Sequence, residues 1–236
     1  MSASCILSAM RMRQIIRTAS LARHVHVEPY ASLVLAGGYE EAGDQGRFRV
    51  NAGDVIFHDA FEAHLDRFVK RGAIVLNLRL APTDSYTTAC GRVRDPDRVI
   101  RVAEGDRSAA AELLLSSSVR WTPQFVDWPD ELAARLLECP SVKLSAWAAE
   151  KGIAPWTVSR GFAQVFGVSP EAFRARVRAR KAWKAVQGTP VTLAAIAADL
   201  GFADQAHMTR SVKELTGLAP QAWRANRFKT GGRCLA

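Results

Sequence analysis

The sequence LAAIAADLGFADQAHMTRSVKELTGLAPQAWR at residues 193–224 repeats the pattern of LSAWAAEKGIAPWTVSRGFAQVFGVSPEAFR at residues 144–174, with one residue inserted in its turn. The two copies agree at six positions. These are Leu144 and Leu193, Ala148 and Ala197, Gly152 and Gly201, Arg160 and Arg210, Gly167 and Gly217, and Pro170 and Pro220. One structural unit is therefore present twice in the chain.

Each copy has the pattern of two short helices joined by a glycine turn. In the first copy, Leu144 and Ala148 lie one helical turn apart, and Gly152 then favours a left-handed helix end. The second helix begins near Pro155, whose fixed φ suits a first-turn position. Each copy closes with Gly-x-x-Pro, in which glycine ends one helix and proline opens the next.

The second helix of each copy separates an apolar stripe from an outward face, at about 100° per residue. The stripes contain Val158, Phe162 and Val165 in the first copy, and Met208, Val212 and Leu215 in the second. The outward faces carry Trp156, Arg160 and Ala163 in the first copy, and Ala206, Arg210 and Lys213, flanked by Gln205 and Thr209, in the second. This is the arrangement of a helix-turn-helix unit, whose second helix enters the major groove of DNA.

A connecting helix is expected at residues 171–187, between the two units. Its ~17 residues would span ~25 Å at 1.5 Å per residue. Such a rod can hold two recognition helices in successive major grooves, which lie ~34 Å apart along the duplex. A single chain is therefore expected to read two adjacent half-sites.

The paired units, with GFADQAHMTRSVKELTGLAP in the second, resemble the AraC/XylS family of bacterial transcription regulators over residues 141–228. The resemblance implies DNA contacts from six residues: Trp156, Ser159, Arg160, Gln205, Thr209 and Arg210. The family usually has phenylalanine where Met208 and Val212 stand, and a hydroxyl helix cap where Ala219 stands. These departures put the rigidity of the second unit in question, but not its fold.

The distribution of charge supports a nucleic-acid partner. Residues 141–236 contain 15 Lys and Arg against 5 Asp and Glu, a net charge of +10, whereas residues 1–140 contain 17 against 18, a net charge of −1. Basic side chains that displace counterions supply most non-specific DNA affinity. On the connecting helix, Arg174, Arg178 and Lys181 share one side, where a solvated face and contacts to backbone phosphates are the two alternatives.

Cysteine usage and hydropathy indicate the compartment. Cys5, Cys90, Cys139 and Cys234 form no C-x-x-C pair, so a disulfide framework or zinc module is not expected, and a reducing cytoplasm is. No run approaches the ~18 apolar residues of a membrane span. The short apolar run near the N-terminus does not make a secretion signal.

The N-terminal part has β character, with short apolar runs separated by Gly, Asn and Asp. Expected strands are 24–27, 31–36, 47–50, 54–58, 64–69 and 73–80. Turns are expected at Gly37-Gly38, at 43–46, at 51–54 and at Arg71-Gly72. This spacing predicts a small sandwich or barrel.

The histidines of this part form a second pattern. His24 and His26 alternate along one strand and share a face, and Gly53 is followed eleven residues later by His64. This resembles the cupin double-stranded β-barrel, in which three histidines and a glutamate converge. The usual glutamate position falls at Tyr30 or Ala31, and Glu28 could replace it.

We take His24, His26, Glu28, Tyr30, His58 and His64 as candidate effector-binding residues, and His24, His26 and His64 as candidate metal ligands. Three alternatives stay open: a divalent metal, which imidazoles and a carboxylate suit; a polar pocket for an organic ligand; and histidines that serve strand pairing alone. No cofactor is certain on these grounds.

The predicted fold class is α+β, with a cupin-like barrel at 1–105, a helical bridge at 106–140 and an all-α DNA-binding domain at 141–228. Within that domain the helix-turn-helix units fall at about 142–166 and 192–216, and residues 229–236 form a tail. Helices are expected at 97–103, at 106–117 and from Pro129 to Glu138. The bridge carries either a homodimer contact, as the resemblance implies, or plain intramolecular packing.

These patterns predict a sequence-specific transcription regulator, either an activator or a repressor, and not an enzyme. Its expected partners are double-stranded DNA, a small-molecule effector, a second copy of the chain and, for an activator, RNA polymerase, with no membrane. Two alternatives remain open: a metal-dependent cupin enzyme with a DNA-binding appendage, and an architectural DNA binder. No phosphate-cradling glycine loop or nucleophile elbow supports other chemistry.

Overall fold

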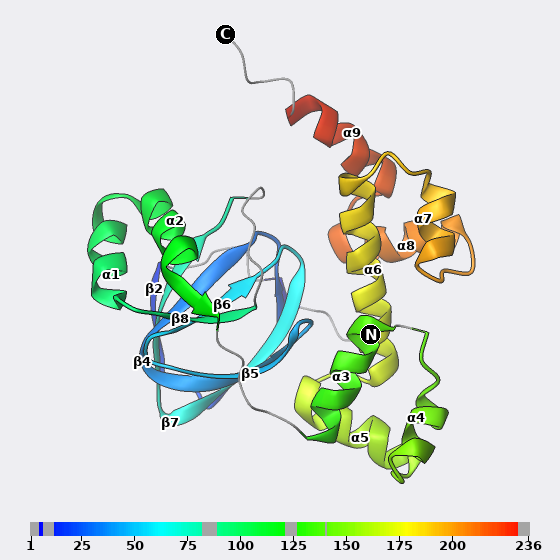
Figure 1. Ribbon diagram of the computed structural model, residues 1–236, viewed down its shortest axis with the longest axis horizontal. Helices are drawn as coiled ribbons and strands as arrows, with labels where there is room; N and C mark the ends of the chain where they lie inside the picture. Colours follow the sequence, from blue (N-terminus) through cyan, green and yellow to red (C-terminus); the bar gives the residue numbers. More distant parts are fainter. Residues whose placement is uncertain (1–4, 7–11, 82–88, 121–126, 140, 231–236) are drawn as a thin grey trace. The chain divides into compact units, whose positions relative to one another are not determined.

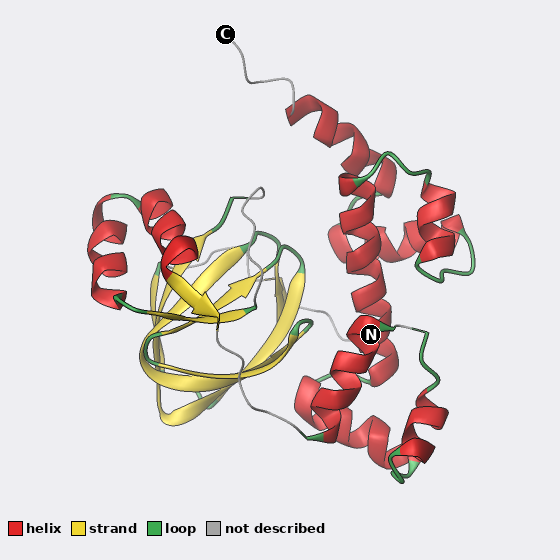
Figure 2. Cartoon of the chain, viewed as in Figure 1, coloured by secondary structure: helices red, strands yellow, loops and turns green. Residues whose placement is uncertain are grey.

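The computed structural model describes residues 5–6, 12–81, 89–120, 127–139 and 141–230. The chain divides into two compact units, Met1–Glu131 with Gln164–Gly167, and Leu132–Ala163 with Val168–Ala236. Strands make up most of the first unit and helices the second, as Figure 2 shows. The α+β class predicted from the sequence is confirmed.

The first unit is built on one strongly curved sheet (Figure 1). Its order is β1-β3-β7-β4-β6-β8-β9, with β2 paired to β7 and β5 paired to β4. The pairing is antiparallel except between β1 and β3. The strands are β1 (Cys5–Ile6), β2 (Arg13–Ile16), β3 (Ser20–His26), β4 (Tyr30–Gly43), β5 (Gly46–Asn51), β6 (Asp54–His58), β7 (Glu62–Arg79), β8 (Cys90–Val93) and β9 (Ser118–Arg120).

The two longest strands, β4 and β7, run through positions where turns were expected. The predicted turns at Gly37-Gly38 and Arg71-Gly72 are wrong. Gly37 and Gly72 both have a φ of +70°, but Gly37 lies within the continuous strand β4 and Gly72 within β7. The β4–β7 register shifts on either side of Gly37, which marks a bulge. A Cβ on Gly37 would lie 2.0 Å from the Gly72 carbonyl oxygen. Glycine is needed here for both conformation and space.

Two helices cover one face of the sheet, α1 (Pro96–Gly105) and α2 (Arg107–Ser117). Their buried residues Val99, Ala110 and Leu114 pack in one cluster with strand residues such as Leu33 and Phe57. Each such fully buried aliphatic side chain stabilises the fold by roughly 1.5–3 kcal/mol. Both helices therefore belong to the core of the first unit.

The second unit contains α3 (Trp128–Glu138) from Leu132 onward, α4 (Leu144–Glu150), α5 (Pro155–Phe166) as far as Ala163, α6 (Pro170–Gly188), α7 (Leu193–Asp199), α8 (Gln205–Thr216) and α9 (Pro220–Thr230). The predicted bridge of 106–140 is thus divided between the units, with α2 in the first and most of α3 in the second. The connecting helix expected at 171–187 is α6, one residue longer at each end. Among the described residues, no helix is long and apolar enough to cross a bilayer.

Candidate DNA interface and ligand pocket

Helix α5 presents the outward face predicted for the first recognition helix. Trp156 is 75% exposed, Ser159 and Arg160 are exposed, and Ala163 is half-buried. Val158 and Phe162 are buried as predicted, while Phe166 fills the place given to Val165, which is only half-buried. Helix α5 therefore buries the Phe162 ring on one side and exposes the Trp156 indole and the Arg160 guanidinium on the other.

Helix α8 repeats this arrangement in the second unit. Met208 and Val212 are fully buried, so the two positions that depart from the family pattern still fill the core. The predicted contact residues Gln205, Ala206, Arg210 and Lys213 are exposed, and Thr209 is half-buried.

Local hydrogen bonds fix both ends of α8. The Asp204 carboxylate accepts from the backbone N–H of His207 at 2.6 Å and caps the first turn. Gly217 ends the helix in the left-handed conformation at φ 79°. These caps set the position of Arg210 on the rigid middle of the helix.

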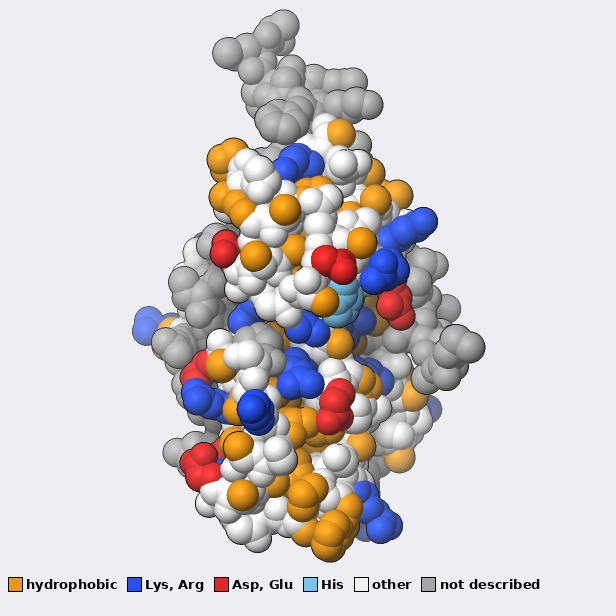
Figure 3. Space-filling view, turned by 90° about the vertical axis from the view of Figure 1, so that its right-hand side faces the viewer, with side chains coloured by type: hydrophobic (Ala, Val, Ile, Leu, Met, Phe, Trp, Pro, Cys, Tyr) orange, Lys and Arg blue, Asp and Glu red, His pale blue; other side chains and the backbone are white. Residues whose placement is uncertain are grey.

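The two equivalent arginines are available to a ligand. Within the part of the chain that the structure describes, neither Arg160 nor Arg210 forms an ion pair with a carboxylate. On the face drawn in Figure 3, Lys and Arg side chains gather around the middle with some acidic side chains among them. An unpaired, solvent-facing guanidinium on a recognition helix suits an anionic or base-edge partner.

Two arginines of α6 donate hydrogen bonds to carbonyl groups of the chain itself. Arg174 donates to the Val142 carbonyl at 3.2 Å, and Arg178 donates to the Gly201 carbonyl at 2.8 Å. The Arg178 guanidinium also lies 4.9 Å from the centre of the Phe202 ring. The first residue contacts the chain before α4, and the second contacts the turn between α7 and α8. Both side chains therefore fasten a helix-turn-helix unit to α6, so a plainly solvated face is wrong for them.

In the first unit, the three predicted histidines converge. His24 and His64 are direct cross-strand partners on β3 and β7, and their ring centroids are 4.3 Å apart. His26 lies with its ring centroid 5.0 Å from that of His24 and 5.4 Å from that of His64. The alternation along β3 thus brings all three imidazoles together, as the sequence pattern predicted.

Two more predicted residues join this cluster, and one does not. The Tyr30 ring stacks on His58 with centroids 4.2 Å apart, and its hydroxyl oxygen lies 3.4 Å from Nε2 of His64. Glu28 lies outside the cluster, because its half-exposed side chain pairs with Arg79 at 2.8 Å. Glu28 as a replacement ligand or effector contact is therefore wrong.

The carboxylates of the cluster come from residues that the sequence analysis missed, Glu41 on β4 and Asp66 on β7. They are cross-strand partners, and both are buried. Oε2 of Glu41 lies 3.6 Å from Nε2 of His58, and Oδ2 of Asp66 lies 4.0 Å from Nε2 of His64. In sequence, Glu41 lies between the turns expected at Gly37-Gly38 and at 43–46, so no strand was expected there. Its place near the end of the long strand β4 gives it a buried face.

Burial controls the charge of this cluster. It raises the pKa of Asp66 to about 8, and burial together with Asp66 and Glu62 raises the pKa of Glu41 well above its usual value. Burial, together with His24, lowers the pKa of His26 to about 4, and burial lowers that of His64 far below its usual value. At neutral pH the imidazoles of His26 and His64 are therefore neutral, which is the form that binds metals.

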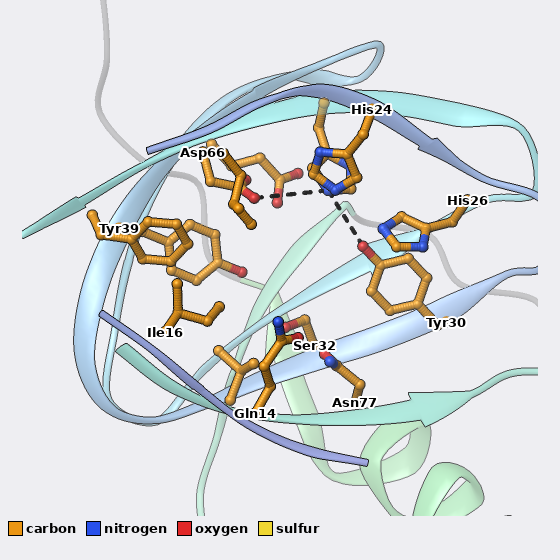
Figure 4. A pocket seen from close by; sticks show the side chains of 14 residues that line it. Gln14, Ile16, His24, His26, Tyr30, Ser32, Tyr39, Asp66 and Asn77 are labelled. Carbon is orange, nitrogen blue, oxygen red and sulfur yellow. Dashed lines mark hydrogen bonds and ion pairs between the residues drawn. The ribbon is translucent and has the colours of Figure 1, made fainter. Parts of the chain in front are cut away.

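The cluster borders a cavity of about 120 Å³, shown in Figure 4. The lining residues are Gln14, Ile16, Leu21, His24, His26, Tyr30, Ser32, Tyr39, Glu41, His64, Asp66, Phe68, Val75 and Asn77. Two groups could hold a metal ion, His24 with His26 and His64, and Glu41 with His58 and His64. The first contains the ligands predicted from the sequence. The second shares only His64 with it.

Two helix-turn-helix units with exposed arginines at matching positions define a DNA-binding protein. Residues 147–226, about a third of the chain, match the model of a family described as a helix-turn-helix domain. The second unit is thus a helix-turn-helix domain, and the predicted binding of DNA is confirmed at this level.

Among solved structures, the chain is similar to a probable AraC family transcriptional regulator from Rhodopseudomonas palustris CGA009, with 24% identity, a TM-score of 0.38, and 41% of this chain and 93% of that chain covered. It is also similar to the DNA-binding domain of AdpA in complex with a target DNA, with 20% identity, a TM-score of 0.42, and 46% and 99% covered. Unsaturated-fatty-acid-bound ToxT from Vibrio cholerae strain SCE256 matches at 8% identity and a TM-score of 0.42, with 90% and 92% covered. No curated protein matches the chain.

Proposed function

We propose that the protein is a sequence-specific transcription regulator whose helices α5 and α8 read adjacent major grooves, and whose first unit binds a small effector. The observation that carries the proposal is the repeated recognition helix, with Arg160 and Arg210 exposed at matching positions. The 19 residues of α6 between the units span about 28 Å at 1.5 Å per residue. That length is comparable to one turn of B-DNA, about 34 Å.

Each exposed side chain suits a particular contact. Arg160 and Arg210 can each donate two hydrogen bonds to O6 and N7 of guanine, with about 1–3 kcal/mol of discrimination per pair. Gln205 matches an adenine edge, and Trp156 offers an apolar surface to a thymine methyl group or a sugar. The small side chains of Ala163 and Ala206 let the helix backbone approach the groove, while Ser159, Thr209 and Lys213 suit phosphates or bases.

Selection of bound sequences from a random DNA pool tests this proposal. The wild-type chain should enrich two conserved segments about one helical turn apart. Arg160→Ala and Arg210→Ala should each lower affinity for the selected site by about 5- to 150-fold, the equivalent of 1–3 kcal/mol. Arg101→Ala is the matched control, since Arg101 is an exposed arginine on α1 of the first unit. A wild-type chain that enriches no sequence would instead be an architectural binder.

The effector pocket is the cavity beside His24, His26, Tyr30 and His64. It combines convergent polar groups with perturbed pKa values, which is typical of a binding site. A regulator of this type acts in the cytoplasm, where it meets DNA and, as an activator, RNA polymerase. A second copy of the chain is the remaining proposed partner, and sedimentation of the purified protein with and without DNA tests it.

A further inference from the structure

Three strands of the first unit bring a carboxylate and two imidazoles to one point. Glu41 lies on β4, His58 at the end of β6 and His64 on β7, and their exposed fractions are 1%, 1% and 3%. One ligand atom from each lies within 4.8 Å of the other two. The pairing of β4 with both β6 and β7 fixes the three backbone positions. The cluster is therefore built by the rigid part of the sheet and not by a loop.

Polar atoms in this cluster lack partners. Among the described residues, Oε1 of Glu41, Nδ1 of His64 and Oδ1 of Asp66 are buried without a hydrogen bond. Buried polar atoms in native proteins are nearly always hydrogen-bonded or bound to an ion or water. A cation bound by Glu41 and His64 would give these buried atoms of the two residues a partner.

The size of the cavity and the ligand types limit what can bind. The cavity beside Glu41 and His64, about 120 Å³, is small compared with the roughly 300–1,000 Å³ of most organic-ligand sites, and His58 lies behind its lining residues. Two imidazoles and a carboxylate form a ligand set that binds Zn²⁺ and related ions. The alternative group of His24, His26 and His64 contains no carboxylate and includes the partly exposed His26, whereas Glu41, His58 and His64 are all buried and supply one negative charge.

We propose that Glu41, His58 and His64 bind one divalent transition-metal ion of the Zn²⁺ class, and that this ion is the effector of the first unit. The Tyr30 hydroxyl lies 3.4 Å from Nε2 of His64, which leaves Nδ1 of that ring for the ion, and the Asp66 carboxyl group lies near the same edge at 4.0 Å. Tyr30 stacks on His58 and fixes the other imidazole. The effector role rests on the proposed function, whereas the site itself does not.

The binding test uses the full chain after removal of metal with a chelator. Titration with ZnCl₂, followed by calorimetry and by thermal unfolding, should show one ion per chain with a micromolar or lower Kd. Glu41→Gln and His58→Gln should each weaken binding at least about 10-fold, since each removes a ligand. Glu28→Gln is the matched control and should leave the Kd unchanged, because Glu28 lies outside the cluster and pairs with Arg79.

Two results overturn the assigned site. The first is a wild-type chain that binds no Zn²⁺. The second is a loss of affinity in His24→Gln with none in Glu41→Gln, which places the ion on the three histidines. X-ray absorption by the Zn²⁺-loaded wild type needs no variant, so it counts the imidazole ligands even if a substitution prevents folding. Two imidazoles are expected, and three would contradict the carboxylate ligand as well.

A DNA-binding measurement tests the effector role of the ion separately from the metal site. The affinity of the wild type for its selected DNA should change at least about 5-fold between the metal-free and Zn²⁺-loaded forms, and Glu41→Gln should abolish this response. Binding of Zn²⁺ with no change in DNA affinity refutes the effector role and leaves the proposed function standing. A chain that prefers no DNA sequence in either form refutes the proposed function, while the Zn²⁺ titration still decides the site.

Discussion

Replacing Arg178 by methionine tests whether this side chain fastens the second helix-turn-helix unit to α6. Arg178 donates to the Gly201 carbonyl at 2.8 Å and lies 4.9 Å from the centre of the Phe202 ring. A hydrogen bond from a charged donor contributes about 1.5–3 kcal/mol, with the lower end appropriate to this solvent-accessible position. A guanidinium over a ring adds about 0.5–1 kcal/mol. Arg178→Met, which keeps the apolar stem, should therefore lower the free energy of unfolding by about 2 kcal/mol.

The assay combines chemical denaturation with DNA binding at several salt concentrations. A fastening role predicts a lower denaturation midpoint and weaker contacts from α8, with an unchanged salt dependence. Arg178→Lys should recover only part of the stability, since an ammonium can still donate to the Gly201 carbonyl but lacks the planar guanidinium over the Phe202 ring. A phosphate contact predicts the opposite, unchanged stability and a salt slope reduced by about one. That second result would refute the assignment of Arg178 to the fold.

Three further predictions follow from local geometry. Gly72→Ala should lower the free energy of unfolding by more than about 2 kcal/mol and make the first unit sensitive to limited proteolysis, because a Cβ there would lie 2.0 Å from the Ile16 carbonyl oxygen at a φ of +70°. Gly105→Ala is the control, since no atom lies within 4 Å of its new Cβ. Equal proteolysis of the two variants would contradict the clash. Asp204→Ala should cost about 1 kcal/mol by removing the α8 cap, measured by denaturation, and an unchanged midpoint would show that the cap is not needed. In a variant without Cys5 and Cys234, iodoacetamide at pH 8 should label Cys139 and spare Cys90. The hydrogen bond with Ser141 lowers the pKa of Cys139, whereas burial raises the pKa of Cys90 to about 12. Thiolate is the reactive form and only about one Cys90 in ten thousand carries it at that pH, so mass-spectrometric detection of modified Cys90 in folded protein would contradict its burial.

The second unit could be predicted from sequence because its signals are local. Gly201 and Gly217 mark a turn and a helix end, Pro170 opens α6, and apolar residues recur with the helical period. Each of these constraints acts within a few residues of chain. The expected bounds of α6 differ from the observed ones by one residue at each end, as is common for helix termini.

The first unit was harder because strand pairing joins distant residues. Gly37 and Gly72 have the sequence signature of turns, yet both lie within the paired strands β4 and β7. Gly37 marks a bulge, and Gly72 lets the Ile16 carbonyl approach the strand closely. The short strands β8 and β9 contain four and three residues, too few to show a period.

The pocket shows the same limit. Alternation along β3 is local, so the shared face of His24 and His26 could be predicted. The position of Glu41 opposite Asp66 depends on a register between residues far apart in the chain. The polar run around Glu41 gives no sign of burial, and the carboxylates of the cluster were therefore missed.

Methylation interference on the selected DNA site tests the central claim most directly. Methylation of guanine N7 blocks the arginine contact proposed for each recognition helix. If α5 and α8 read adjacent major grooves, interference should occur at two positions about 10–10.5 base pairs apart. Arg160→Ala should remove one of the two and Arg210→Ala the other, with the remaining position unaffected. Interference that is confined to one position, or that neither substitution alters, would contradict the reading of two adjacent grooves by one chain.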